Sequence, residues 1–299
     1  MKQFVKAFFA EFAYPAEAEE QLLRDFDAIY GCEETKNAFE ALLARYEASM
    51  DCDVKQLITE MEEISGKAGI NKYAGGLLLI VCLSKTLQRY YDEAGVGRDV
   101  WHDTMEDLKW KLFECRDVYG VWGTFVPWWF PLHMTRRIFA CGRLQFERIR
   151  FGRNYEKNGV VLTPETPVLN VHIPRTMTRL DPKSVADAYD KAAAFFRKHF
   201  PEEYGKGPIV FVCHSWLLFP RHLEVLSEKA NLRQFILGFE ILEDYLSEDY
   251  HEVWRLFDKN YEGDPDALPC DTSLRRAYVN WIRNGEKIGG GYGIRVYKD

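Results

Sequence analysis

The sequence predicts an α+β protein, with an all-α N-terminal domain over residues 1–125 and an α/β domain over residues 126–299 whose sheet is mixed and mostly antiparallel. Two observations lead to this prediction. In the first part, apolar residues recur at three- and four-residue steps, which is the spacing of amphipathic helices. In the second part, alternating and β-branched segments are interleaved with helical ones, an order typical of α/β domains.

Helical periodicity runs from residue 16 to about residue 120. In the segment 16–31, Leu22, Phe26 and Ile29 fall on one face of a helix. Further helices are predicted at residues 32–49, 53–69, 77–87 and 98–120. Because these segments show no convincing strand alternation, we interpret them as a helical bundle. The apolar run 74–83 is about half as long as a membrane-crossing helix, which favours a buried helix.

The segment 121–132, "VWGTFVPWWFPL", changes character, because two prolines and three tryptophans interrupt the periodicity. Aromatic side chains pave ligand pockets, so the segment could form the wall of a binding site. The alternative is an aromatic seam that packs one half of the chain on the other.

Strand signals dominate the second part. Residues 167–174, "PVLNVHIP", alternate between two faces, and 208–216, "PIVFVCHSW", is apolar on both, as a central strand is. Between them lies an amphipathic helix that begins at Pro182, with Asp181 as its expected cap. Other predicted strands cover residues 144–151, 160–163, 239–246 and 287–299, and other helices cover residues 249–257 and 272–284.

The last predicted strand contains "GGGYG" at residues 289–293. Glycine has no side chain, so the backbone of a ligand-binding strand could approach its ligand closely here. The other interpretation is a bulged and tightly packed final strand.

Composition argues against some function classes. The chain is 47% hydrophobic and has a net charge of −7, which argues against general nucleic-acid binding, because that needs a basic face. Its seven cysteines form no CxxC pair and no secretory signal opens the sequence, so we expect a cytoplasmic protein with reduced thiols and no membrane partner. No HxH or HExxH spacing predicts a metal site.

Three reactive side chains, Cys213, His214 and Ser215, stand together where the central strand meets a turn. If the strand stays extended, Cys213 and Ser215 share one face and His214 takes the other. Cys213 and His214 then form no dyad, and Cys213 is more simply a packed or pocket-lining thiol than the nucleophile of a thiol hydrolase. Trp216 follows at the same turn as a further pocket candidate.

Histidine suits a general base, because its ordinary pKa lies near neutrality. His172 lies at the carboxyl end of the strand 167–174, and Asn170 shares its face. The candidate catalytic residues are therefore His172, His214 and Ser215. Asn170, Cys213 and Trp216 are the candidates for substrate binding. The plainer interpretation is that both histidines hydrogen-bond strand ends.

Several motifs resemble those of one group of bacterial acyltransferase-domain proteins. They are "DTMEDLKW" (103–110), "GRLQFE" (142–147), "HIP" (172–174), "CHSWLLFP" (213–220) and "NLRQF" (231–235), which occur in a similar order and spacing. That family pairs a helical N-terminal domain with a GNAT-like C-terminal α/β domain. The resemblance implies an acyl-CoA-dependent N-acyltransferase in which a small amine attacks the thioester of acetyl-CoA or a longer acyl-CoA directly, with no metal.

The resemblance also implies where the donor binds. In the GNAT order, a strand, a helix whose amino end faces the pyrophosphate, and a second strand splayed from the first would be residues 167–174, the helix from Pro182, and 208–216. Helix N–H groups can hold phosphates. The cofactor-binding candidates lie in the loop and first helical turn and are Arg175, Thr176, Arg179, Lys183 and Ser184.

One departure from the superfamily pattern concerns the phosphate loop. The usual loop carries glycines, whereas no glycine occurs between Pro174 and Ser184. The alternative function is therefore a non-catalytic ligand-binding or scaffold protein on a degenerate GNAT-like fold.

Overall fold

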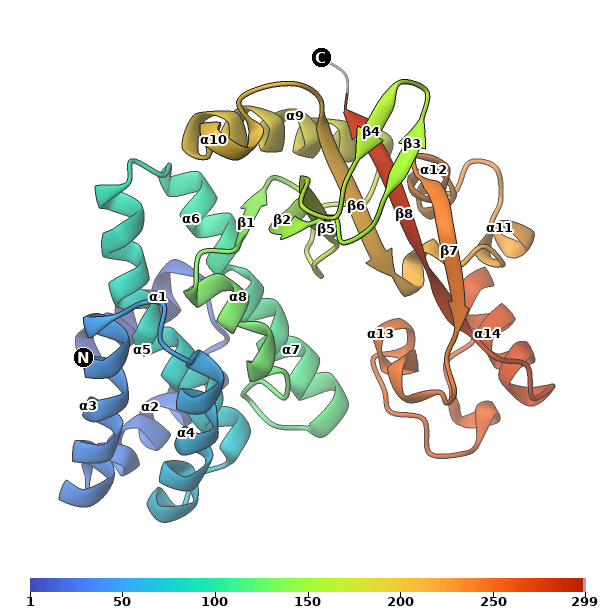
Figure 1. Cartoon of the computed structure of the whole chain (residues 1–299). Helices are drawn as coiled ribbons and strands as arrows, with labels where there is room; N and C mark the ends of the chain where they lie inside the picture. The colour runs from blue at the N-terminus through green and yellow to red at the C-terminus, as the bar shows by residue number, and fades with distance from the viewer. Residues whose placement is uncertain (298–299) are drawn as a thin grey trace. The chain divides into compact units, whose positions relative to one another are not determined.

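Helices make up the first of two compact units, Met1–Phe139 and Ala140–Asp299, in a computed structural model that describes residues 1–297 (Figure 1). The helices of the first unit are α1 (Lys2–Glu11), α2 (Ala16–Tyr30), α3 (Glu33–Ala48), α4 (Val54–Ala68), α5 (Lys72–Glu93), α6 (Arg98–Met105), α7 (Asp107–Tyr119), the 3-10 turn η1 (Pro127–Trp129) and α8 (Pro131–Met134). The predicted domain limits, 1–125 and 126–299, stay a prediction.

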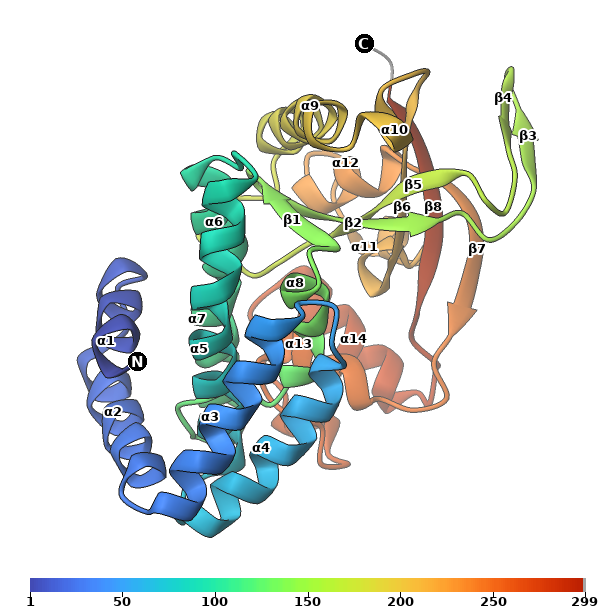
Figure 2. The same ribbon diagram turned by 60° about the vertical axis from the view of Figure 1, so that its left-hand side comes forward.

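The centre of the first unit is α5, whose residues from Ala74 to Ser84 are all buried. Its neighbour α4 comes very close, because a Cβ atom on Gly75 would lie 2.0 Å from the Ser65 hydroxyl. Figure 2 shows α3 and α4 side by side as a helical hairpin. Within residues 1–297, no helix is long and apolar enough to cross a membrane.

The tryptophan-rich segment packs within the first unit. The backbone N–H of Thr124 donates to the Tyr73 carbonyl at the start of α5 (2.9 Å), and Gly123 leaves no room for a side chain against Tyr73. The indole N–H of Trp129 donates to the Asp107 carboxylate on α7 (2.9 Å). These bonds hold the segment against α5 and α7.

The second unit is built on a six-stranded sheet in the order β1-β2-β5-β6-β8-β7. β2–β5, β6–β8 and β7–β8 pair antiparallel and β5–β6 pair parallel, so the predicted mixed, mostly antiparallel sheet is confirmed. A separate hairpin pairs β3 with β4. The strands are β1 (Ile138–Cys141), β2 (Leu144–Arg150), β3 (Tyr155–Lys157), β4 (Val160–Leu162), β5 (Pro167–His172), β6 (Ile209–Ser215), β7 (Glu240–Leu246) and β8 (Gly289–Tyr297).

The parallel pair is joined by α9 (Pro182–His199), which lies against one face of the sheet (Figure 1). Tyr189 of α9 packs on Phe211 of β6 with ring centroids 4.6 Å apart, and Phe146 of β2 lies 5.4 Å from Phe211. The other face carries Val168, Val212 and their neighbours under the β3–β4 hairpin. Because α9 and the hairpin cover opposite faces, the strands are apolar on both, as the sequence of β6 indicated.

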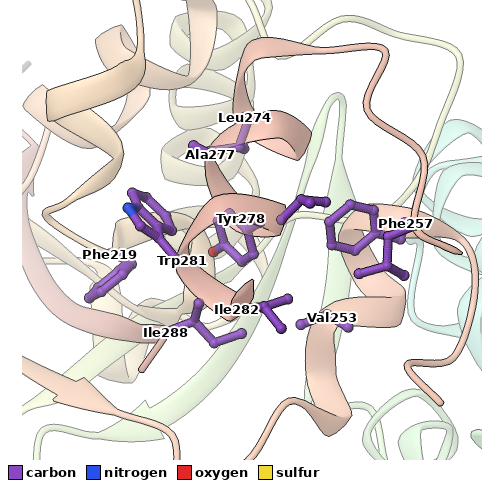
Figure 3. Packing of buried hydrophobic residues seen from close by; sticks show 11 residues of the cluster. Phe219, Val253, Phe257, Leu274, Ala277, Tyr278, Trp281, Ile282 and Ile288 are labelled. Atoms are coloured by element: carbon purple, nitrogen blue, oxygen red, sulfur yellow. The ribbon is translucent and has the colours of Figure 1, made fainter. Parts of the chain in front are cut away.

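The C-terminal part forms its own core around α14 (Ser273–Arg283). Figure 3 shows the rings of Phe219, Phe257, Tyr278 and Trp281 gathered there. The remaining elements of this unit are short: α10 (Pro201–Tyr204), η2 (Trp216–Leu218), α11 (His222–Val225), α12 (Asn231–Leu237), η3 (His251–Val253), α13 (Trp254–Phe257) and η4 (Pro265–Ala267).

Several short elements were not predicted. They include β1, α12 and the N-terminal α1, and the single predicted helix 98–120 is two helices that meet at Glu106. The four residues of β1 and the seven of α12 span less than two helical periods, so their spacing carries little signal, whereas α1 has ten residues and its apolar spacing was overlooked.

Candidate active site

The parallel strands β5 and β6 part at their carboxyl ends. Their pairing consists of Leu169 with Phe211 and Asn170 with Val212, yet β5 continues to His172 and β6 to Ser215. β6 stays paired with β8 as far as Ser215, so the opening lies between β5 and β6. Backbone groups on the two diverging edges can therefore pair with an extended ligand.

A cluster of three polar side chains lies beside this opening. The Nε2 atom of His172 is 3.0 Å from Oε2 of Glu147, and the Asn170 amide donates to the same oxygen at 3.3 Å. The register of β2 on β5 pairs Glu147 with Asn170 and Gln145 with His172, which places all four on one face of the sheet. We call this the site face.

The cluster selects the tautomer of His172. Nε2 of His172 lies 3.0 Å from the Glu147 carboxylate and 3.1 Å from the Asn170 amide nitrogen. A carboxylate only accepts hydrogen bonds, so we assign the imidazole proton to Nε2, which then donates to Oε2 of Glu147 beside the Asn170 amide and leaves the lone pair on Nδ1. The Glu147 side chain is 9% exposed and that of His172 is 21% exposed. In this arrangement a buried carboxylate orients a partly exposed imidazole, as it does where a histidine acts as a general base.

Three buried polar atoms at the same place have no hydrogen-bond partner within the described residues: Nε of Arg143, Nε2 of Gln145 and Oδ1 of Asn170. Arg143 donates from Nη1 to the Pro174 carbonyl (3.0 Å), and burial lowers the pKa of its guanidinium to about 10, so it remains a cation at neutral pH. Buried polar groups are almost always paired in folded proteins, so an ordered water or a ligand would be needed to complete the bonding of these three atoms.

Sequence reasoning missed Arg143, Gln145 and Glu147 as site residues. A signal was present in "GRLQFE", where these polar residues alternate with apolar ones on a strand that is otherwise fit for the core. Nothing local in the sequence showed which strand they would face.

His214 lies on the site face too, but it has other partners. Its exposed ring stacks on Tyr245 of β7 at 4.8 Å and 17°, and Tyr292 of β8 lies 6.4 Å away. Tyr245 reaches it across Gly290, where a Cβ atom would lie 2.3 Å from the tyrosine hydroxyl. Of the two interpretations of "GGGYG", the structure therefore shows the tightly packed final strand.

Cys213 and Ser215 lie on the opposite side of β6. Cys213 is completely buried, and this burial raises the pKa of its thiol. The Ser215 hydroxyl accepts a hydrogen bond from the Leu217 N–H (3.2 Å) and so caps the turn η2. Trp216 packs against the core around α14, with its ring at 84° to that of Tyr278. Through these contacts, Cys213, Ser215 and Trp216 each contribute to packing or to the local turn. Their roles in substrate binding or catalysis stay predictions.

Replacing Cys213 with Ala is expected to leave transfer activity unchanged, because the thiol is buried and direct transfer needs no nucleophilic sulfur. In the folded protein, an alkylating reagent should modify the exposed Cys32, whose pKa is lowered by backbone N–H groups of Thr35 and Glu34, and spare Cys213. Peptide mass spectrometry checks both residues. An acyl group trapped on Cys213 would contradict this prediction.

The predicted pyrophosphate loop runs from β5 to α9. Arg175 lies 3.6 Å from Asp258, and the Thr176 hydroxyl accepts from the Thr178 N–H (2.9 Å). The carboxylate of Asp181 caps α9 and accepts the N–H groups of Lys183 (3.0 Å) and Ser184 (2.9 Å). An anion at this helix end would therefore have to displace a carboxylate.

The structure offers no metal centre in the part of the chain that it describes. Among residues 1–297, no group of three or more His, Cys, Asp and Glu side chains could hold a metal ion.

Two protein-family models match the chain. A model of a GNAT-like C-terminal domain matches residues 138–295, and a model of an N-acyltransferase N-terminal domain matches residues 3–135. No curated protein matches the chain.

Two solved structures resemble the whole chain. One is an acyltransferase in complex with decanoyl-CoA, at 22% identity and a TM-score of 0.75 over 97% of this chain and 86% of that one. The other is an acyltransferase in complex with decanoyl-CoA and teicoplanin, at 21% identity and a TM-score of 0.76 over 98% of this chain and 88% of that one. At such identities the likeness shows a shared fold.

Proposed function

The chain belongs to the family that joins an N-acyltransferase N-terminal domain to a GNAT-like C-terminal domain, and on this premise we propose that it moves an acyl group from acyl-CoA to an amine of a small molecule. The observation that carries the proposal is the Glu147–His172 pair beside the diverging ends of β5 and β6. Solved structures that share its fold include complexes with decanoyl-CoA and with octanoyl-CoA, which supports a donor of medium chain length.

The donor is proposed to lie between β5 and β6. The pantetheine arm can pair with the strand edges beyond Asn170 and Val212, as an added strand does. Main-chain N–H groups of these edges then polarise the thioester carbonyl. The phosphates lie against the loop and first turn that carry Arg175, Thr176, Arg179, Lys183 and Ser184. Cytoplasmic location would give the protein access to CoA thioesters.

The reaction needs the acceptor amine to lose a proton. His172 takes this proton on Nδ1, directly or through water, while Glu147 stabilises the imidazolium that results. The amine nitrogen forms a bond to the acyl carbon, the carbon–sulfur bond breaks, and the CoA thiolate leaves and takes up a proton. This route forms no covalent intermediate with the enzyme, which agrees with the burial of Cys213.

The direct test is a coupled measurement on the purified full chain. Release of the CoA thiol is followed with acetyl-, octanoyl- and decanoyl-CoA in the presence of a panel of amines, and the acylated product is identified by mass spectrometry. Amine-dependent thiol release with at least one donor is expected. Hydrolysis without acyl-amine product would contradict an N-acyltransferase.

The pyrophosphate position gives a separate prediction. Replacing Arg175 and Arg179 with Ala should weaken CoA binding by at least about 1.5 kcal/mol, since charge-assisted hydrogen bonds contribute about 1.5–3 kcal/mol each. Replacing Asp181 with Ser keeps a capping hydroxyl but removes the negative charge, so this variant should bind CoA more tightly. Isothermal titration checks both variants. Arg197, at the other end of α9, supplies the control substitution with Ala.

A second candidate function is a non-catalytic ligand-binding or scaffold protein on the same fold. The absence of glycine from residues 175–183, together with the capping of α9 by Asp181, favours it. Thermal unfolding with CoA and decanoyl-CoA separates the candidates, because a ligand at 100 times its Kd stabilises by about 2.7 kcal/mol. No stabilisation by either ligand would favour the scaffold.

A further inference from the structure

We infer that the acceptor is an amine that carries a carboxylate a few bonds from its nitrogen, as an amino acid does. The inference rests on the proposed function and adds a substrate class to it. Its basis is the arrangement of unpaired polar atoms on either side of His172.

Two hydrogen-bond donors lie on one side of His172. Gln145, which is 1% exposed and stands opposite His172 in the sheet, has an Nε2 atom with no hydrogen-bond partner among residues 1–297. Arg143, two residues earlier, has an unpaired and buried Nε atom, and its guanidinium forms no ion pair with a carboxylate of the described chain. Arg143 is half-buried, and a partly desolvated cation is stabilised by an anion, so an anionic oxygen would complete this pair of donors.

An acceptor atom lies on the other side of His172. Oδ1 of Asn170 is buried without a hydrogen-bond partner in the described chain, and Asn170 stands opposite Glu147. An N–H of the substrate amine would fill this place next to the base. Residues two apart on a strand lie about 7 Å apart, so the donors and Oδ1 are separated by roughly the span of a short amino acid and its hydrogen bonds.

Other ligands fit these atoms less well. The thioester carbonyl is neutral and does not need a guanidinium. The donor phosphates are better matched by the exposed basic residues Arg175, Arg179 and Lys183 than by the buried amide of Gln145. The carboxylate of the acceptor is the anion whose chemistry and position agree with both donors.

The experiment compares matched acceptors on the full chain. Glycine, L-leucine and L-phenylalanine are each tested beside the corresponding methyl ester, with decanoyl-CoA as donor. The ester amines are less basic and more often deprotonated at neutral pH, so a preference for the acid cannot come from amine reactivity. We expect kcat/KM to favour the acids by about 10- to 100-fold, the range that one charge-assisted pair provides.

Variants assign this preference to residues. Arg143→Met and the isosteric Gln145→Glu should bring the acid-to-ester ratio close to one, whereas Arg143→Lys should keep part of it. Arg150→Met is the matched control, because Arg150 lies at the far end of β2 and pairs with Glu203 at 3.0 Å. The acid-to-ester ratio of the Arg150→Met variant should equal that of the wild type. Circular dichroism verifies that each variant is folded.

The outcomes separate this inference from the proposed function. Amine acylation with equal kcat/KM for acids and esters overturns the inference and leaves the transferase standing. If Arg143→Met loses CoA affinity in calorimetry and keeps the acid preference, Arg143 contacts the donor phosphates and the inference is wrong. If no pair of donor and acceptor releases CoA thiol, the proposed function fails, and the inference fails with it.

Discussion

Replacing His172 with Ala is expected to lower kcat by about 100- to 10,000-fold, the usual contribution of a positioned general base. The reason is the contact of 3.0 Å between Nε2 of His172 and Oε2 of Glu147 on the site face beside the diverging strands. Glu147→Gln should cause a smaller loss, because the amide can still contact the ring but no longer stabilises an imidazolium. Steady-state kinetics with a fixed amine and decanoyl-CoA measure both losses.

Two further histidines provide controls for this prediction. His251, whose side chain is 89% exposed, should tolerate Ala without a change in kcat. His214 stacks on Tyr245 on the same face of the sheet, so it is the competing candidate for the base. If His214→Ala abolishes activity and His172→Ala leaves most of it, the roles assigned here are reversed. The pH profile of kcat/KM should lose its lower limb in the variant that lacks the base.

Acidification is expected to destabilise the C-terminal core through His222. This fully buried residue contacts the Leu217 carbonyl through Nδ1 (3.2 Å) and the Tyr278 hydroxyl through Nε2 (2.8 Å), and burial lowers its pKa from 6.5 to about 4. Between pH 6.5 and about pH 4, His222 is protonated in the unfolded chain but stays neutral in the folded chain. The free energy of unfolding therefore falls by about 3 kcal/mol across this pH window, because each unit of pKa difference contributes about 1.36 kcal/mol.

Urea unfolding of the wild type and of His222→Gln at pH 7, 5.5 and 4 measures this effect. The variant starts less stable, because it loses packing against Trp216 and Tyr278, but it should lose about 3 kcal/mol less between pH 7 and pH 4. Carboxylates that titrate in the same range act on both proteins, so they cancel in the comparison. Parallel pH dependences for the two proteins would show that His222 is not the titrating group.

Local patterns were sufficient for much of the architecture. The three- and four-residue spacing in residues 16–31 and the alternation in residues 167–174 appear in the structure as α2 and β5. Asp181 and Pro182 begin α9 as their capping chemistry predicts. Helix and strand periods are repeated within a few residues, so they can be read without knowing what the segment packs against. Strand parity likewise placed Asn170 and His172 on one face.

The sequence by itself therefore determined the fold class, the strand–helix–strand order and the two candidate bases, His172 and His214. Only the tertiary structure decided which side chains contact these two histidines. Glu147 reaches His172 because of the register of β2 on β5, and a slip of one residue would turn its carboxylate to the other face. Register depends on the packing of whole strands and on the turns that join them. The folded sheet therefore determines which residue of another strand contacts His172. The residues next to His172 in the sequence do not indicate it.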